Sequence, residues 1–175
     1  MERSWRNGKR TDKIWTFDLD AIIEVGAIRV ENGKLVETEE LVFQELVRPY
    51  KKIIPPRVEE VTGISKDMVK DARQIYDVFN DFADFVGDRV LVGYNSRKFD
   101  SGFLVRAGRY ARRIERFRHF DVLNEAEKYS KNNNLENAKP ETVGQSLGIV
   151  NPEAHRALSD AITTAKVYLE LKEQM

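Results

Sequence analysis

The chain of 175 residues carries 29 basic and 29 acidic side chains, and 41% of its residues are hydrophobic. This length fits one domain with a buried core, so we expect a single domain over residues 1–175 with a basic arm at 1–13. The sequence contains no cysteine, which excludes disulfides, zinc fingers and thiol catalysis. Without a signal peptide or an apolar run of the roughly 18 residues that span a bilayer, we expect a soluble, cytoplasmic protein and no membrane partner.

The first third of the chain is rich in the β-branched and aromatic residues typical of strands, at residues 13–20, 22–30 and 35–47. Asn32-Gly33, between the last two, is a strong hairpin signal. Short helical turns are expected over residues 57–64, and Ser65 is a good N-cap for the next turn.

The rest of the chain alternates helices with short strands. Apolar residues recur at helical spacing from Ile75 to Val86, and Gly87 is a helix stop. Strands are expected at 89–94 and 117–123, and further helices at 103–117, 125–129, 141–147 and 157–172. Antiparallel strands followed by alternating strands and helices predict an α/β domain with a mixed sheet and helices on both sides.

Four aspartates stand at positions that suit a metal site. Asp18 and Asp20 alternate on one strand and so project from the same face. Asp100 begins a predicted helix, and Asp160 lies on the last helix. Mg²⁺ and Mn²⁺ prefer such oxygen ligands, and two of these ions can promote phosphodiester cleavage. A lone aspartate is more often solvated or a helix cap, but two carboxylates in an apolar strand repel unless a cation bridges them.

His155 precedes Asp160 by five residues. Five helical steps turn by about 500°, so the two do not share a helix face, and His155 can approach Asp160 only from the loop before the helix. An imidazole beside a reacting water is a good general base. The alternative is an ordinary surface histidine. His119 lies inside a predicted strand and is interpreted as structural.

These pieces together resemble the DnaQ-like exonucleases of the DEDDh type, a family that includes polymerase proofreading subunits and RNase T. FDLDA followed by IIEVGAIRV looks like the first motif of the family, and GYNSRKFDSGFL looks like the second. HRALSDA resembles the third, with the His-x4-Asp spacing of the DEDDh branch. FDVLNEA resembles a further segment, in which Asp121 is a supporting residue.

The resemblance implies an RNase H-like fold with a mixed five-stranded sheet, and a 3′→5′ exonuclease that releases nucleoside monophosphates from a DNA or RNA 3′ end. Asp18, Asp20, Asp100 and Asp160 would hold two Mg²⁺ or Mn²⁺ ions, and His155 would deprotonate the attacking water. A polymerase or a helicase is a candidate partner. The alternative is an exonuclease-like module that binds nucleic acid and has lost efficient chemistry.

Three features depart from the family pattern. The family has glutamate where this chain has Asp20, and Tyr94 stands where histidine is commoner. The third departure is a missing turn of roughly ten residues, because Asp20 and Ala21 run directly into Ile22, whereas a hairpin needs about two loop residues. Either the turn is truly deleted or residues are missing from the sequence, and the completeness of the other motifs favours the second explanation.

A basic stripe is predicted on the helix expected at 103–117. Arg106, Arg109, Arg113 and Arg116 recur at helical spacing opposite an apolar face. They are candidates for a phosphate track that binds nucleic acid without regard to sequence, with a solvated helix face as the alternative.

Overall fold

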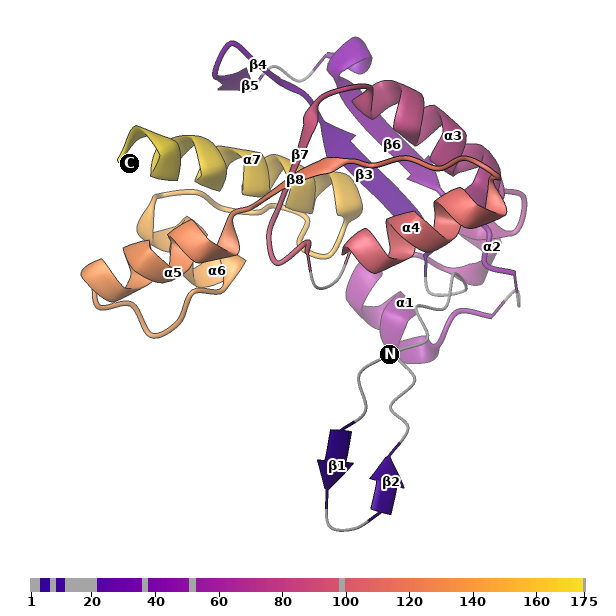
Figure 1. Ribbon diagram of the computed structural model, residues 1–175, viewed down its shortest axis with the longest axis horizontal. Coiled ribbons are helices and arrows are strands. Elements are labelled where there is room, and N and C mark those ends of the chain that lie inside the picture. Colours follow the sequence, from indigo (N-terminus) through magenta and orange to yellow (C-terminus); the bar gives the residue numbers. More distant parts are fainter. Residues whose placement is uncertain are drawn as a thin grey trace.

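The structure is a computed structural model that describes residues 4–6, 9–11, 22–35, 38–50, 53–97 and 100–174 of the chain. Its strands are β1 (Ser4–Arg6), β2 (Lys9–Thr11), β3 (Glu24–Ile28), β4 (Val30–Glu31), β5 (Lys34–Leu35), β6 (Val42–Leu46), β7 (Val90–Gly93) and β8 (Arg118–Asp121) (Figure 1). Its helices are α1 (Pro56–Thr62), α2 (Lys66–Val69), α3 (Ile75–Val86), α4 (Asp100–Tyr110), α5 (Leu123–Asn132), α6 (Pro140–Ser146) and α7 (Ala157–Glu173), with a 3₁₀ turn at Glu39–Leu41.

Strand β3 has helices on both of its faces. It pairs antiparallel with β6, with Glu24 opposite Leu46 and Ile28 opposite Val42. Val25 and Ala27 pack against the core of α3, whereas Glu24 contacts the start of α7 on the other side. The alternation of side chains along a strand produces this division. The prediction of helices on both sides of the sheet is confirmed here.

Strands β7 and β8 pair in parallel, from Val90 opposite Arg118 to Gly93 opposite Asp121. Helix α4 connects them, which makes a β–α–β unit, and α7 contacts both β3 and β7. Antiparallel and parallel pairs together confirm the predicted mixed α/β architecture. The strand predicted at 13–20, which would be the fifth of the sheet, lies outside the described residues.

Two of the buried apolar clusters in the described part of the chain connect these elements. The first joins α3 to β6 through Phe43, Val78 and Phe82, and the Phe43 and Phe82 rings meet edge to face with centroids 5.7 Å apart. The second lies beneath α5, α6 and α7 and contains Val122, Val143 and Val167 with no exposed surface. The first cluster also contacts Leu104 of α4, and the second contains Val167 and Leu171 from the second half of α7.

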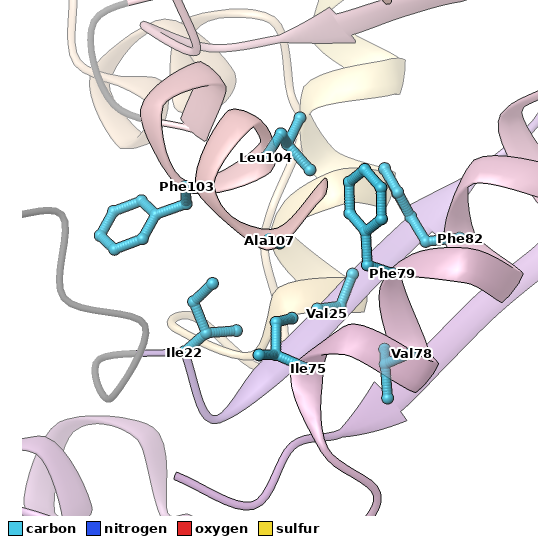
Figure 2. A pocket seen from close by; sticks show the side chains of 9 residues that line it. All are labelled: Ile22, Val25, Ile75, Val78, Phe79, Phe82, Phe103, Leu104 and Ala107. Atoms are coloured by element: carbon cyan, nitrogen blue, oxygen red, sulfur yellow. The ribbon is translucent and has the colours of Figure 1, made fainter. Parts of the chain in front are cut away.

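A small apolar cavity of about 30 Å³ lies between β3, α3 and α4 (Figure 2). It is lined by Ile22, Val25, Ile75, Val78, Phe79, Phe82, Phe103, Leu104 and Ala107. The space is about that of one water molecule, and a buried water needs polar partners that this apolar lining lacks. We interpret the cavity as a packing gap.

Several local signals in the sequence are confirmed. Asn32 and Gly33 have φ angles of 52° and 72°, as a two-residue turn between paired strands requires. Ser65 caps α2 by accepting a hydrogen bond from the N–H of Met68. Gly87 ends α3 with φ 58°, a conformation that glycine adopts easily.

The helix predicted at 103–117 is wrong in its extent. α4 begins at Asp100 and ends at Tyr110. Arg112 takes a left-handed φ of 54°, and its N–H bonds to the carbonyl of Arg109 while the N–H of Arg113 bonds to that of Gly108. This pair of bonds is the Schellman motif that terminates helices. An arginine in the left-handed conformation is uncommon, so the spacing of apolar residues alone did not predict where α4 ends. The helix predicted at 125–129 is longer than expected, since α5 covers Leu123–Asn132.

Among the described residues, no helix is long and apolar enough to cross a membrane.

Candidate active site

His155 and Asp160 are held together by the turn that precedes α7. The N–H of His155 donates a hydrogen bond of 3.2 Å to Oδ1 of Asp160, and both residues are exposed. His155 lies in the turn before the helix, as its spacing from Asp160 requires, and has a left-handed φ of 70°. Asp160 lies in the first helical turn, where the N-terminal dipole favours a negative charge.

Asn151 binds the same carboxylate oxygen of Asp160. Its Nδ2 donates a hydrogen bond of 2.6 Å to Oδ1 of Asp160, and its Oδ1 accepts from the N–H of Glu153 and the hydroxyl of Ser159. Asn151 was not among the residues predicted from the sequence. An asparagine directly before a proline is an ordinary turn residue, and only the structure brings it against Asp160.

Asp121 organises the loop that leads to Asp100. Its Oδ1 accepts the N–H of Asn95 at 2.7 Å and of Leu123 at 3.1 Å, and its Oδ2 accepts the N–H of Arg97 at 3.2 Å. Asn95 has a left-handed φ of 57°. Asp121 therefore ties the end of β8 to the β7–α4 loop, and its role as a supporting residue of a metal site stays a prediction.

Asp100 is the first residue of α4 and keeps an exposed surface. Partial burial of its carboxylate, with a smaller contribution from the negative charge of Asp121, raises the pKa of Asp100 to about 6. A bound cation would relieve both effects, because it favours the ionised form.

Two of the four predicted metal ligands, Asp100 and Asp160, lie among the described residues. Asp18 and Asp20 lie outside the described residues, and the described part of the chain contains no cluster of three or more His, Cys, Asp or Glu side chains that could hold a metal by itself. Asp100 and Asp160 are exposed residues, and their carboxylate oxygens are the donors that Mg²⁺ and Mn²⁺ prefer. These two residues fit a hard divalent cation, and the convergence of all four stays a prediction.

The prediction of a single helical stripe of arginines is wrong. Arg106 and Arg109 lie on α4, but Arg113 and Arg116 follow its last residue. Arg113 pairs with Glu115 at 2.6 Å and with Asp84 at 2.8 Å. Two carboxylates thus neutralise the charge of Arg113, while the binding role of the other three stays a prediction.

His119 lies on β8, and its Nδ1 is buried without a hydrogen-bond partner among the described residues. Burial and the positive charge of Arg97 lower the pKa of His119, against a smaller opposing effect of Asp121. A neutral, partly buried imidazole agrees with the structural interpretation of this histidine.

The order of these elements and residues matches a known family. The model of the RNase T family, described as "Exonuclease", matches residues 14–168. This chain belongs to the RNase T exonuclease family. The match spans nearly the whole chain, including all three segments that resemble DEDDh motifs, and it makes the chain an exonuclease domain.

Among curated proteins, a DNA polymerase III PolC-type of Thermotoga maritima is 31% identical over 158 residues. The match covers 90% of this exonuclease domain but only 11% of the relative. The chain thus spans about a tenth of the length of the polymerases it resembles.

Solved exonucleases share the fold. Exonuclease X in complex with 5′ overhanging duplex DNA superimposes with a TM-score of 0.64 at 21% identity, over 87% of this chain and 82% of that chain. The nuclease domain of 3′hExo, a DEDDh family member bound to rAMP, gives 0.63 at 19% identity, over 87% and 92%. S. pombe Pop2p in its Mg²⁺- and Mn²⁺-bound form gives 0.64 at 19% identity, over 89% and 71%.

The preferred explanation of the missing turn is wrong. The full sequence has 175 residues, in which Asp20, Ala21 and Ile22 are consecutive. The turn after the first acidic pair is therefore absent from this exonuclease domain.

Proposed function

We propose that this exonuclease domain is a divalent-metal-dependent 3′→5′ exonuclease that removes nucleoside monophosphates from the 3′ end of a nucleic acid. The arrangement of His155 and Asp160 carries the proposal, because one short turn binds the backbone N–H of the exposed residue His155 to the carboxylate of the exposed residue Asp160. The family match supports it, as do the carboxylates of Asp100 and Asp160, two residues with exposed surface.

Each side chain then has a chemical role. Asp18, Asp20, Asp100 and Asp160 would hold two Mg²⁺ or Mn²⁺ ions, which when bound help to ionise the attacking water and stabilise the departing oxygen. His155 would accept the proton of that water, for which its exposed position leaves access. Asn151 would keep the Asp160 carboxylate oriented. Arg106, Arg109 and Arg116 would bind phosphates along the strand.

DNA is the preferred substrate in this proposal, and a replication polymerase is the preferred partner. The supporting observation is the match to a segment of DNA polymerase III PolC-type proteins. A domain of such a polymerase would meet the 3′ end of the growing strand, so removal of a terminal nucleotide would serve proofreading.

Digestion of labelled oligonucleotides tests the proposal. Single- and double-stranded DNA and RNA, each labelled at the 5′ end, are incubated with the protein and Mn²⁺. We expect a ladder of DNA products that shorten from the 3′ end and slower loss of RNA. Release of the 5′ label as a mononucleotide in the first turnover would contradict the polarity.

The second candidate is a module that binds nucleic acid but cleaves it poorly. The absent turn after Asp20 favours it, because in the family this turn helps to hold the terminal nucleotide. Fluorescence anisotropy with a labelled oligonucleotide separates the candidates. Binding that persists together with an intact oligonucleotide after prolonged incubation with Mn²⁺ would identify the binding module.

A further inference from the structure

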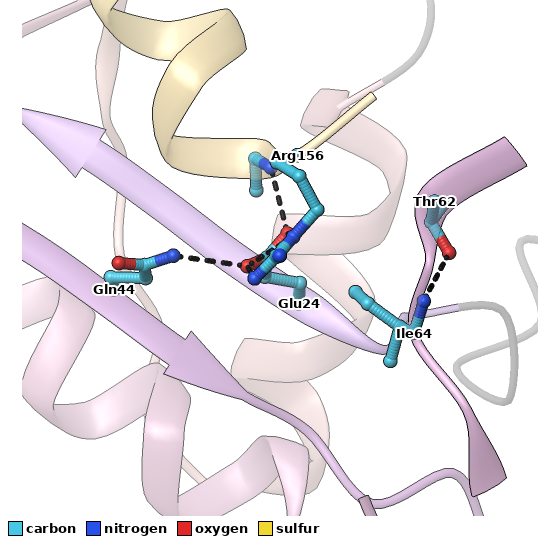
Figure 3. A network of polar contacts seen from close by, with 6 residues as sticks. Glu24, Gln44, Thr62, Ile64 and Arg156 are labelled. Carbon is cyan, nitrogen blue, oxygen red and sulfur yellow. Dashed lines mark hydrogen bonds and ion pairs between the residues drawn. The ribbon is translucent and has the colours of Figure 1, made fainter. Parts of the chain in front are cut away.

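A buried carboxylate joins β3 to the first turn of α7 (Figure 3). The side chain of Glu24 is 4% exposed, and its Oε1 accepts a hydrogen bond of 2.8 Å from Nη2 of Arg156. Nε of Arg156 lies 3.2 Å from each carboxylate oxygen. Oε2 also accepts a 2.7 Å hydrogen bond from the N–H of Ala157, the first residue of α7. Glu24 therefore binds a guanidinium and a helix N-terminus together.

The surroundings keep Glu24 ionised. A carboxylate removed from water is costly unless charge and hydrogen bonds compensate. Burial alone would raise the pKa of Glu24, but hydrogen bonds from Arg156, Ala157 and Gln44 outweigh burial and hold the pKa below its ordinary value. The contact is thus a charge-assisted clamp with several donors, unlike an exposed ion pair, which contributes little.

Gly26 lets the two backbones meet at this point. A Cβ placed on Gly26 would lie 2.4 Å from the carbonyl carbon of Ala157 and 2.4 Å from the nitrogen of Leu158. Glu24 and Gly26 are two residues apart on β3, so both face α7. Every side chain larger than that of glycine would push the start of α7 away from the strand.

The residues of the proposed reaction flank this clamp directly. His155 precedes Arg156, and the N–H of Asp160 donates a 2.9 Å hydrogen bond to the carbonyl of Arg156. The guanidinium of Arg156 is bound to β3, so the backbone of Arg156 is held in place. The position of this backbone determines where the chain runs before Arg156, toward His155, and after it, toward Asp160. A shift of Arg156 would therefore move both the imidazole and the carboxylate.

We propose that Glu24 is a positioning residue of the exonuclease site, which orients His155 and Asp160 by holding Arg156 and the start of α7 against β3. This inference rests on the proposed function, since it assigns the clamp to the hydrolytic reaction. Glu24 and Arg156 act through the turn and do not touch the substrate.

Three substitutions in the full chain probe the clamp. Glu24→Gln keeps the shape and removes the charge, Arg156→Lys keeps the charge and removes the two-pronged geometry, and Gly26→Ala separates the backbones. Asp81→Asn is the matched control, because it breaks an exposed 2.6 Å pair with Arg73. With 5′-labelled DNA and Mn²⁺, kcat of Glu24→Gln should fall about 10- to 100-fold with KM nearly unchanged, as for other outer residues that orient a site.

Arg156→Lys should have a kcat between those of wild type and Glu24→Gln, because lysine keeps the positive charge. The kcat of Gly26→Ala should be close to that of Glu24→Gln. The control Asp81→Asn should keep the wild-type kcat. A wild-type kcat in Glu24→Gln would overturn the proposal.

Amide hydrogen exchange of the metal-free protein measures how firmly the turn at residues 155–157 is held, and it does not depend on enzymatic activity. In Glu24→Gln, amides of residues 155–157 should exchange at least about tenfold faster, because a neutral acceptor replaces an ionised one. Amides of residues 165–171 should keep their wild-type rates. Uniform acceleration along α7 would mean that Glu24 only stabilises the fold, and would also overturn the proposal.

The two proposals fail in different ways. If the wild-type protein neither shortens DNA nor gains stability from Mn²⁺, the proposed function is wrong. The exchange experiment still decides whether Glu24 orders the His155 turn, because it requires neither metal nor substrate.

Discussion

The N–H of His155 donates a 3.2 Å hydrogen bond to Oδ1 of Asp160, so the proposed base and one proposed metal ligand belong to a single turn. His155 has a φ of 70°, which is uncommon for a residue with a side chain. Such a conformation persists only where its surroundings hold it, and it often occurs at functional sites. The carboxylate of Asp160 supplies part of that hold.

Mn²⁺ should stabilise the wild-type protein and fail to stabilise Asp160→Asn. At a Mn²⁺ concentration 100 times the Kd, binding adds about 2.7 kcal/mol, which corresponds to a Tm rise of roughly 5–10 °C for a chain of this size. Differential scanning fluorimetry measures this rise. Asp77→Asn is the matched control, because Asp77 lies in the first turn of α3 as Asp160 does in α7. Equal rises in both variants would remove Asp160 from the metal site.

His155→Ala should lower turnover and leave metal binding intact. Loss of a general base typically costs about 10²–10⁴-fold in rate, whereas the imidazole is not a ligand in this account. Single-turnover digestion of a labelled oligonucleotide gives the rate, and the Mn²⁺-induced Tm rise serves as the control. Unchanged turnover would show that His155 is an ordinary surface histidine.

Asp121→Asn should weaken metal binding although Asp121 is not a proposed ligand. The carboxylate accepts the backbone N–H groups of Asn95 and Arg97 in the loop before Asp100 and that of Leu123, and an asparagine offers only one acceptor oxygen. We expect Mn²⁺ affinity to fall about 10- to 100-fold, the usual cost of losing an outer residue of a metal site. Calorimetric titration measures the affinity, again with Asp77→Asn as control. Wild-type affinity would confine Asp121 to loop stability.

The stabilising effect of Glu24 should depend on pH in a defined direction. Hydrogen bonds outweigh burial and hold the folded-state pKa of Glu24 below its ordinary value of 4.5. The unfolded chain therefore takes up this proton first as the pH falls. The stabilisation is fully present above pH 4.5 and is lost as the pH falls through the lower folded-state pKa.

Urea denaturation of wild type and Glu24→Gln checks this direction. The difference between their free energies of unfolding should be constant near neutral pH and should shrink at about pH 3. A difference that stays the same at both pH values would show that the charge of Glu24 contributes nothing to stability.

Local signals predicted those parts of the fold in which a few neighbouring residues decide the backbone. The Asn32-Gly33 turn, the Ser65 cap and the helix ending at Gly87 each follow from residues adjacent in sequence. The end of α4 did not follow, because arginine at position 112 takes the left-handed conformation usually left to glycine.

The sequence predicted those parts of the candidate site whose residues lie close together in the chain. His155 and Asp160 are five residues apart, so their shared turn could be inferred from helical geometry. Glu24 and Arg156 are 132 residues apart, and only folding brings them together. A glutamate between two apolar residues and two positions before a glycine is the one signal that could have drawn attention to Glu24, since the strand pattern alone suggests an outward-facing polar residue.

Release of nucleotides from the 3′ end of a 5′-labelled DNA oligonucleotide, compared between wild type, Asp160→Asn and Asp77→Asn, tests the central claim most directly. With Mn²⁺, wild type and Asp77→Asn should shorten the strand stepwise and release nucleoside monophosphates, and Asp160→Asn should leave it intact. An intact strand with the wild-type protein, or equal shortening by Asp160→Asn, would contradict the account.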